Sequence, residues 1–214
     1  MTKSAPTNVE QPYWDRGELV VGMDEVGRGA LAGPVTVGAV VLAPNTPIEG
    51  VHDSKTLSAA NRTRLSEQIF TDAAAVAIGD ASADEVDTLG LTGALKLAGE
   101  RALAALTLPY VAVLLDGRHN FLQASTPTTM IEKGDQKSQS IAAASIVAKV
   151  HRDTLMISAA RTFPDYGFAG HKGYGSQAHR EAIARYGVCP LHRRTFAPCM
   201  PGAQLSLLST DPPQ

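Results

Sequence analysis

The sequence has few cysteines, almost no net charge and no long apolar run. Only two of its 214 residues are cysteines, Cys189 and Cys199, which is too few for a disulfide framework and fits no zinc-binding spacing. The most apolar run, residues 35–43, is far shorter than the ~20 residues of a membrane-spanning helix. Residues 1–12 are polar and lack the apolar core of a secretory signal. We therefore expect a cytoplasmic protein with free thiols and no membrane contact.

The net charge of the chain hides an uneven distribution. Nineteen basic and 21 acidic residues give a formal charge of −2, so overall positive charge cannot drive binding to a nucleic acid. Residues 1–148, however, carry 11 basic and 17 acidic residues, a net of −6, whereas residues 149–214 carry 8 and 4, a net of +4. A polyanion would therefore bind locally, through the C-terminal part of the chain.

The length and composition predict one large domain with flexible ends. The chain exceeds the roughly 150 residues of a typical domain, which leaves room for a small annex. Polar and proline-containing segments predict a flexible arm at residues 1–14 and a flexible tail at 201–214. Between them we expect a folded domain at 15–200, with a core at about 15–160 and a basic helical annex at about 161–200.

Hydrophobic patterns predict an α/β fold with three layers. The expected strands are residues 19–23, 35–42, 74–79, 110–115 and 128–131. The expected helices are residues 58–70, 83–106, 138–160 and 177–186. The link between the first two strands is too short for a crossover, so the chain starts as an antiparallel meander. The β/α units that follow complete a five-stranded mixed sheet flanked by helices.

Acidic residues lie where the expected strands end. Asp24 and Glu25 follow the first strand, Asp116 ends the fourth, and Asp135 precedes the long third helix. If the first and fourth strands are neighbours, Asp24 and Asp116 converge at one sheet edge. Carboxylates crowded in this way repel one another, and a hard divalent cation relieves the repulsion. Two such ions can support hydrolysis of a phosphodiester.

Two other interpretations of these acids stay open. An aspartate at a strand end often only caps a loop. Asp153 lies 18 residues after Asp135, about 27 Å along one continuous helix, so it is a weaker candidate for a metal ligand. Its spacing of four from Lys149 also fits a local ion pair.

Four segments, taken together, resemble the bacterial ribonuclease HII family. The first is Gly-Met-Asp-Glu-Val-Gly-Arg-Gly-Ala-Leu-Ala-Gly-Pro at residues 22–34. Residues 53–55 (Asp-Ser-Lys), 134–153 and 171–176 (His-Lys-Gly-Tyr-Gly-Ser) follow in the same order as in that family. The resemblance extends from residue 19 to about 196. Val26, in place of the usual alanine, and Ser176, in place of threonine, are the departures from the family pattern.

The resemblance implies a fold, an activity and a metal site. The fold is ribonuclease H-like with a C-terminal helical annex. The activity is endonucleolytic hydrolysis of RNA in RNA–DNA hybrids and incision on the 5′ side of single ribonucleotides in duplex DNA, leaving 3′-hydroxyl and 5′-phosphate ends. Such an enzyme removes primers and misplaced ribonucleotides during replication and repair. The family's catalytic, metal-binding carboxylates map to Asp24, Glu25, Asp116 and Asp135, with two Mg²⁺ or Mn²⁺ ions.

Recognition of RNA is also implied by the resemblance. The main chain of Gly27, Arg28 and Gly29 reads the 2′-hydroxyl, since a turn without Cβ atoms can approach a sugar closely. Tyr174 stacks on the sugar at an RNA–DNA junction. The alternatives are an ordinary tight turn and an ordinary half-buried tyrosine.

Basic residues are expected to bind the phosphate backbone. Lys55 follows a polar loop and is expected to contact a phosphate, with a bland surface lysine as the alternative. The basic C-terminal part of the chain is supplied mainly by Lys149, Arg152, Lys172, Arg180, Arg185, Arg193 and Arg194. The histidines at 171, 179 and 192 do not suit a hard metal site, so we expect them on the surface or facing a phosphate.

Rival functions and one further partner complete the predictions. A nuclease of the same superfamily that cuts DNA, or a non-catalytic binding module, could share this fold. Residues 204–208, Gln-Leu-Ser-Leu-Leu, resemble the peptide that docks bacterial repair proteins on the sliding clamp, through Gln204, Leu205, Leu207 and Leu208. A plain apolar tail is the alternative. We expect a monomer.

Overall fold

The computed structural model describes residues 4–123 and 125–200, which form two compact units. The described residues of Met1–Val26, Thr36–Asp80 and Leu95–His151 make the first unit. Those of Gly27–Val35, Ala81–Ala94 and Arg152–Gln214 make the second. Residues 201–214, which include the proposed clamp peptide, lie outside the described part of the chain.

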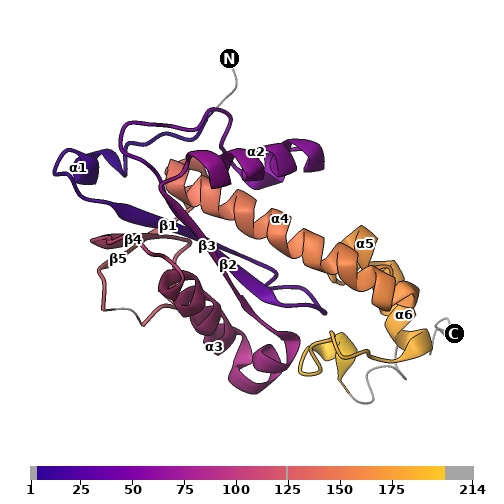
Figure 1. Ribbon diagram of the computed structural model, residues 1–214. Helices are drawn as coiled ribbons and strands as arrows, with labels where there is room; N and C mark the ends of the chain where they lie inside the picture. Colours follow the sequence, from indigo (N-terminus) through magenta and orange to yellow (C-terminus); the bar gives the residue numbers. More distant parts are fainter. Residues whose placement is uncertain (1–3, 124, 201–214) are drawn as a thin grey trace, which may run out of the picture. The chain divides into compact units, whose positions relative to one another are not determined.

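A five-stranded mixed sheet is the centre of the first unit (Figure 1). The strands are β1 (Val20–Val26), β2 (Val35–Val41), β3 (Ala75–Ala81), β4 (Ala112–Asp116) and β5 (Thr128–Ile131). Their order is β3-β2-β1-β4-β5, with β1 antiparallel to β2 and parallel to β4, and β4 parallel to β5. This arrangement confirms the predicted mixed sheet. It also meets the condition under which Asp24 and Asp116 converge, because the first and fourth strands are neighbours.

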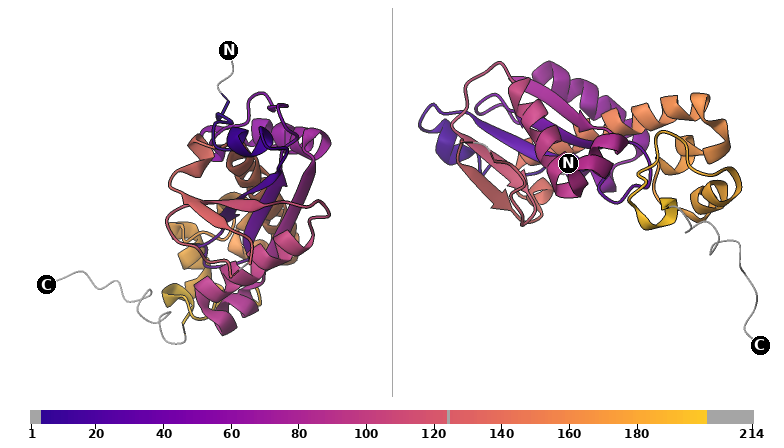
Figure 2. Two further views of the ribbon diagram at one scale, coloured as in Figure 1. Left: turned by 90° about the vertical axis from the view of Figure 1, so that its left-hand side faces the viewer. Right: turned by 90° about the horizontal axis from the view of Figure 1, so that it is seen from below.

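Helices cover both faces of this sheet. The helices of the chain are α1 (Gln11–Trp14), α2 (Ala59–Asp72), α3 (Ala83–Ala104), α4 (Gln139–Thr162), α5 (Phe168–His171) and α6 (Gln177–Tyr186). Figure 1 shows α2 and the first part of α4 on one face and the last part of α3 on the other, and the view from below in Figure 2 shows α3 in front of the sheet. The first unit therefore has the three layers expected from the sequence.

The alanine- and serine-rich start of α4 lets its backbone approach the sheet closely. A Cβ atom added to Gly22 would lie 2.2 Å from the carbonyl carbon of Ser140, and one added to Gly38 would lie 2.4 Å from the carbonyl oxygen of Ala144. Both strands must carry glycine at these positions, because any side chain would push α4 away. The contact fixes the start of α4 against β1, next to the strand ends that carry the acids.

The segment before β1 is packed, which differs from the flexible arm predicted at residues 1–14. Ala5 and Trp14 belong to the core beneath α2 and α4. The carboxylate of Glu10 is buried and accepts hydrogen bonds from the backbone N–H and the hydroxyl of Ser140, at 2.9 and 2.7 Å. A carboxylate at the N-terminus of α4 accepts hydrogen bonds from amides that have no partner within the helix. The local composition of residues 1–14 could not predict this contact, because its partner lies in α4.

The second unit is assembled from three parts of the chain. It contains Gly27–Val35 with the glycine-rich turn, Ala81–Ala94 with the first part of α3 and its kink at Gly90, and everything described from Arg152 onward, including α5 and α6. Its apolar core gathers Met156, Phe168 and Ala182. Isolated β-bridges join Ala30 to Tyr174 and Ala32 to His192. The unit thus extends beyond the annex expected at residues 161–200, because the glycine-rich turn pairs with it.

Two simpler findings complete the fold. Cys189 and Cys199 are free and buried, and burial raises the pKa of each thiol. No helix among residues 4–123 and 125–200 is long and apolar enough to cross a membrane.

Candidate active site

Three aspartates lie near one another at one edge of the sheet in the first unit, and Glu25 is the neighbour of the first of them in β1. β1 and β4 run parallel with Met23 opposite Leu115, so the next residues along, Asp24 and Asp116, follow side by side. Asp116 ends β4, but β1 continues to Val26, so the strand expected to end at residue 23 is longer than predicted and includes both Asp24 and Glu25. β5 leads into η2 (Gly134–Gln136), where the N–H of Gly134 donates to Oδ1 of Asp116 at 2.6 Å. The following residue is Asp135. The sheet therefore brings together the acids that the sequence singled out.

The pKa values of these acids show that they are crowded. Asp24 is 7% exposed, and its burial raises its pKa well above the ordinary value, with the charges of Glu25 and Asp116 raising it further. Burial also raises the pKa of Asp135, and the charges of Asp53 and Asp116 add to the effect. Like charges so placed store electrostatic repulsion that a cation would relieve.

Lys55 is the cation beside these acids. Its ammonium nitrogen lies 3.8 Å from Oδ2 of Asp135. Partial burial disfavours the charge, but the carboxylates of Asp135 and Asp24 outweigh this and raise the pKa of Lys55. The lysine therefore stays protonated at neutral pH and is exposed at the edge of the cluster.

A hydrogen-bond network that the sequence did not reveal holds Asp24. Its Oδ1 accepts the N–H of Glu25 at 2.7 Å, and the hydroxyl of Ser145 also bonds to it. Ser145 in turn lies 2.7 Å, oxygen to oxygen, from Ser54 in η1 (Ser54–Thr56). Asp53, which starts η1, accepts the N–H of Lys55 at 2.9 Å. Asp53, Ser54 and Ser145 were not predicted as site residues. Their polar side chains within segments 53–55 and 134–153 are the sequence feature that could have identified them.

The donor set of the cluster fits a hard divalent cation. Carboxylate oxygens are the ligands that Mg²⁺ and Mn²⁺ prefer. In the described part of the chain, no group of three or more Asp, Glu, His or Cys side chains is placed so that it could hold a metal ion. Mg²⁺ keeps several waters and is commonly held by one or two carboxylates together with substrate phosphates, so a site of this kind does not need three protein ligands.

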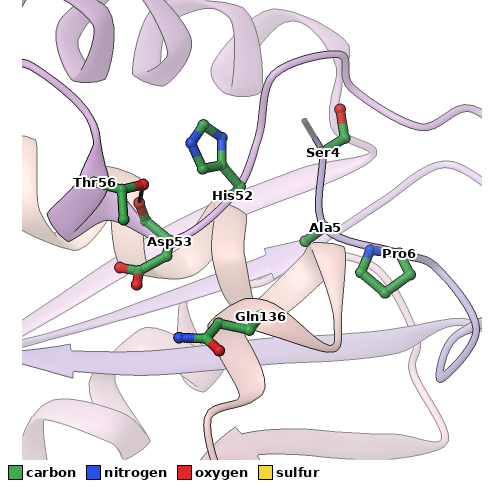
Figure 3. A pocket seen from close by; sticks show the side chains of 7 residues that line it. All are labelled: Ser4, Ala5, Pro6, His52, Asp53, Thr56 and Gln136. Atoms are coloured by element: carbon green, nitrogen blue, oxygen red, sulfur yellow. Dashed lines mark hydrogen bonds between the residues drawn. The ribbon is translucent and has the colours of Figure 1, made fainter. Parts of the chain in front are cut away.

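A pocket of about 440 Å³ lies beside the cluster (Figure 3). Asp53 and Gln136, the neighbours of Ser54 and Asp135, contribute to its wall, and His52 and Thr56 line it as well. The rest of the lining comes from residues 4–6 of the packed N-terminal segment. The pocket therefore borders η2 through Gln136, the residue after Asp135.

The glycine-rich turn in the second unit is held close to a buried arginine. Gly27 has φ +92°, and a Cβ atom there would lie 2.3 Å from Nε of Arg152. A Cβ atom at Gly29 would meet no other atom within 4 Å. Gly27 is therefore required by the turn itself, whereas Gly29 leaves open space beside the backbone. The bridge from Ala30 to Tyr174 sets this turn beside the tyrosine.

Two arginines of the second unit, Arg152 and Arg193, are fully buried. Arg152 donates to the carbonyl oxygens of Ala32, Pro34 and Lys172, at 3.0, 2.9 and 2.9 Å. The expectation that these two arginines bind phosphate is wrong, since carbonyl groups occupy their guanidinium groups. Arg180, Arg185 and Arg194 are exposed, as a phosphate-binding surface requires.

Tyr174 and Lys172, which were predicted to bind substrate, are both partly buried. Tyr174 is half-buried, with the guanidinium carbon of Arg152 5.3 Å from the centre of its ring. The ammonium of Lys172 donates to the carbonyls of Ala169 and Gly170. Lys149 and Asp153 lie on α4, in the first and second units respectively, and their roles stay predictions.

The histidines at 179 and 192 are buried, so their placement on the surface or against a phosphate is wrong. They pack with Tyr166 and Phe168. Aromatic partners from distant parts of the chain remove these rings from solvent.

Comparison with known proteins identifies the family. The family model described as Ribonuclease HII matches residues 21–199. A ribonuclease HII of Methylibium petroleiphilum is 50% identical over 181 residues, 85% of this chain and 91% of that protein. A ribonuclease HII of Thermus thermophilus is 50% identical over 192 residues, 89% and 92% of the two chains.

Solved structures share the fold. Ribonuclease H2 of Pyrococcus horikoshii superimposes with a TM-score of 0.71 at 25% identity, covering 85% of this chain and 95% of its own. Ribonuclease HII of Archaeoglobus fulgidus, solved in complex with PCNA, gives 0.67 at 25% identity, over 83% and 95%. The fold is therefore ribonuclease H-like, and the chain belongs to the ribonuclease HII family.

Proposed function

We propose that the chain is a metal-dependent endonuclease that hydrolyses the RNA strand of RNA–DNA hybrids and cuts on the 5′ side of single ribonucleotides in duplex DNA. The observation that carries the proposal is the crowding of acids where β1 and β4 lie side by side. Burial raises the pKa of Asp24 there, and the charges of Glu25 and Asp116 raise it further. Family membership supplies the substrate class, and the acids supply the chemistry.

The proposed catalytic residues are the four acids, with Lys55 beside them. Asp24, Glu25, Asp116 and Asp135 would hold two Mg²⁺ or Mn²⁺ ions. When bound, the ions supply an activated water and charge stabilisation for the leaving oxygen. The protonated Lys55 would contact a phosphate, which its exposure and its raised pKa support.

Selection of RNA is assigned to the second unit. The backbone of Gly27, Arg28 and Gly29 would read the 2′-hydroxyl, and the open space beside Gly29 supports this role. Tyr174 would stack on the sugar at the junction with DNA. Lys149 and Lys172 would bind backbone phosphates, and Asp153 would at most assist the metal site.

Two matched duplexes test this function. One carries a single ribonucleotide and the other is all DNA with the same sequence, and each is incubated with Mg²⁺ or Mn²⁺. We expect one cut, on the 5′ side of the ribonucleotide, with 3′-hydroxyl and 5′-phosphate ends, and no cut in the all-DNA duplex. Gel analysis of both products decides the result. Cleavage of both duplexes would indicate a DNA-directed nuclease, and cleavage of neither would indicate a binding module.

We also propose that residues 204–208 dock on the sliding clamp. The support is the sequence Gln-Leu-Ser-Leu-Leu together with the structural relative from Archaeoglobus fulgidus, which was solved with PCNA, a sliding clamp. Substitution of both Leu207 and Leu208 by alanine should abolish recovery of the chain on immobilised bacterial clamp. Thr210→Ala, just outside the peptide, is the control and should keep recovery unchanged. Equal recovery of the double variant and the control would leave these residues as a plain apolar tail.

A further inference from the structure

Three histidines of the second unit surround the backbone of the proposed substrate tyrosine. His171 ends α5, His179 lies in α6, and His192 follows α6. The rings of His171 and His179 stack with centroids 4.3 Å apart, and Nε2 of His179 lies 3.1 Å from Nε2 of His192. The proposed catalytic and substrate-binding residues take no part in these ring contacts. His179 and His192 are fully buried.

The backbone partners fix which nitrogen of each ring carries hydrogen. Nδ1 of His179 lies 2.9 Å from the carbonyl oxygen of Tyr174, which can only accept, so this nitrogen donates. Nδ1 of His192 faces the N–H of Cys189 at 2.9 Å, which can only donate, so this nitrogen accepts. In a neutral ring the other nitrogen has the opposite role. His192 therefore donates through Nε2 to Nε2 of His179, and one directed chain runs from Cys189 to Tyr174.

The neutral state that this chain needs is the state that burial imposes. Burial lowers the pKa of both His179 and His192 to about 4, so both rings are neutral at neutral pH. Protonation of His179 would set its Nε2–H against the Nε2–H of His192, with the two nitrogens 3.1 Å apart. Protonation of His192 would set its Nδ1–H against the N–H of Cys189, with the two nitrogens 2.9 Å apart. At neutral pH, the hydrogen-bond chain from Cys189 to Tyr174 therefore has one arrangement of its hydrogens.

His171 fixes the other side of the same peptide segment. Its Nε2 donates to the carbonyl of Tyr166 at 2.7 Å, which leaves Nδ1 to accept the N–H of Gly173 at 3.2 Å. Its own carbonyl accepts the N–H of Tyr174 at 3.0 Å. Lys172 and Gly173 have φ of +53° and +83°, a left-handed conformation that costs a lysine about 1 kcal/mol or more. Such a segment keeps its shape only if its surroundings hold it.

We propose that His179 is a positioning residue for Tyr174. The histidine chain holds the carbonyl of Tyr174, and this fixes the orientation in which the tyrosine ring meets a ribonucleotide followed by DNA. The inference rests on the proposed function, since it assigns Tyr174 to substrate selection. His179 itself touches no substrate.

Two substitutions of His179 separate positioning from stability. The amide of asparagine reaches about as far as Nδ1, so His179→Asn keeps the donor to Tyr174 and leaves Nε2 of His192 without a partner. The amide of glutamine reaches about as far as Nε2, so His179→Gln keeps a partner for His192 and loses the donor to Tyr174. Each variant thus retains one of the two hydrogen bonds.

The measurement compares kcat/KM for two substrates. It is the ratio of kcat/KM for duplex DNA with one ribonucleotide to kcat/KM for a hybrid of one RNA strand with one DNA strand. A loss of folded protein lowers both values equally and leaves the ratio unchanged. We expect His179→Gln to lower the ratio about tenfold, the value of one net hydrogen bond, and His179→Asn to stay within about twofold of wild type, even though it unfolds at a lower temperature. Tyr174→Ala should lower the ratio as well, and adding His179→Gln to it should change nothing further.

The possible results are distinct. A wild-type ratio in His179→Gln, or equal losses in the asparagine and glutamine variants, overturns the positioning role. An additive loss in the double variant also overturns it, because His179 would then act independently of Tyr174. If the unsubstituted chain cuts neither substrate, the proposed function itself fails before the variants are compared.

Discussion

Replacing Asp24 by asparagine is expected to remove catalysis and to stabilise the free protein. Asp24 is buried and its pKa is raised by burial and by the charges of Glu25 and Asp116. Asparagine keeps the shape but removes one of the repelling charges, so the free energy of unfolding should rise by about 1 kcal/mol, or roughly 2–4 °C in Tm. The hydroxyl of Ser145 can turn from donor to acceptor and satisfy the new N–H group.

The rate of cleavage by Asp24→Asn should fall, although its stability rises. Charge stabilisation by a metal ion at phosphorus is worth several kcal/mol, so loss of one ligand should slow cleavage by about a thousandfold or more. Binding of a ribonucleotide-containing duplex should persist, because the basic residues and the second unit are unchanged. A non-catalytic binding module would show no such separation of binding from cleavage.

The test combines thermal unfolding in a chelator with single-turnover cleavage and duplex binding. Glu67→Gln is the matched control, since it removes one negative charge from an exposed position of α2 and should alter neither property. Retained cleavage would remove Asp24 from the catalytic set. A fall in Tm would mean that repulsion among the acids does not limit the stability of the free protein.

Local patterns in the sequence predicted the parts of the site that depend on strand ends. Asp116 ends β4 and Asp24 lies near the end of β1, so their meeting required only that β1 and β4 be parallel neighbours, which the register shows. The small residues of α4 likewise allow the close backbone contact that Gly22 and Gly38 accept. These features depend on hydrophobic periodicity and on residue size, and both can be determined from residues close together in the sequence.

Contacts between distant parts of the chain could not be predicted in the same way. Arg152 appeared to be a phosphate-binding residue because its partners, such as Pro34, lie 118 residues away. The serine pair that supports Asp24 joins residues 91 apart. His179 and His192 are only 13 apart, but their burial depends on a core that includes Ala32 and Met156. Charge and polarity predict an exposed residue unless the folded chain supplies hydrogen-bonding partners.

Arg193 provides the second large effect, this time on the fold itself. Its guanidinium donates through Nε and Nη2 to the carbonyl of Gly33, at 3.0 and 2.9 Å, and through Nη1 to the carbonyl of Arg28 at 3.0 Å. Burial lowers the pKa of Arg193 to about 10, so the group remains a cation at neutral pH. One buried cation thus closes the turn that holds Gly27, Arg28 and Gly29.

Arg193→Met should therefore destabilise the protein by about 3 kcal/mol, because two carbonyls lose hydrogen bonds to a charged donor and each unsatisfied group costs roughly 1–3 kcal/mol. For a chain of this size that corresponds to a fall of roughly 6–12 °C in Tm. Arg193→Lys should recover only part of the loss, since one ammonium lacks the planar fork that reaches both carbonyls. Thermal unfolding of the two variants measures both effects.

The neighbouring residue supplies the control. Arg194 carries the same charge, but its side chain is exposed, so Arg194→Met should change the free energy of unfolding by no more than about 0.5 kcal/mol. Equal losses at 193 and 194 would show that net positive charge, and not the closed turn, stabilises this unit. A large loss at 193 alone would show that a residue counted among the basic charges of the chain stabilises the fold.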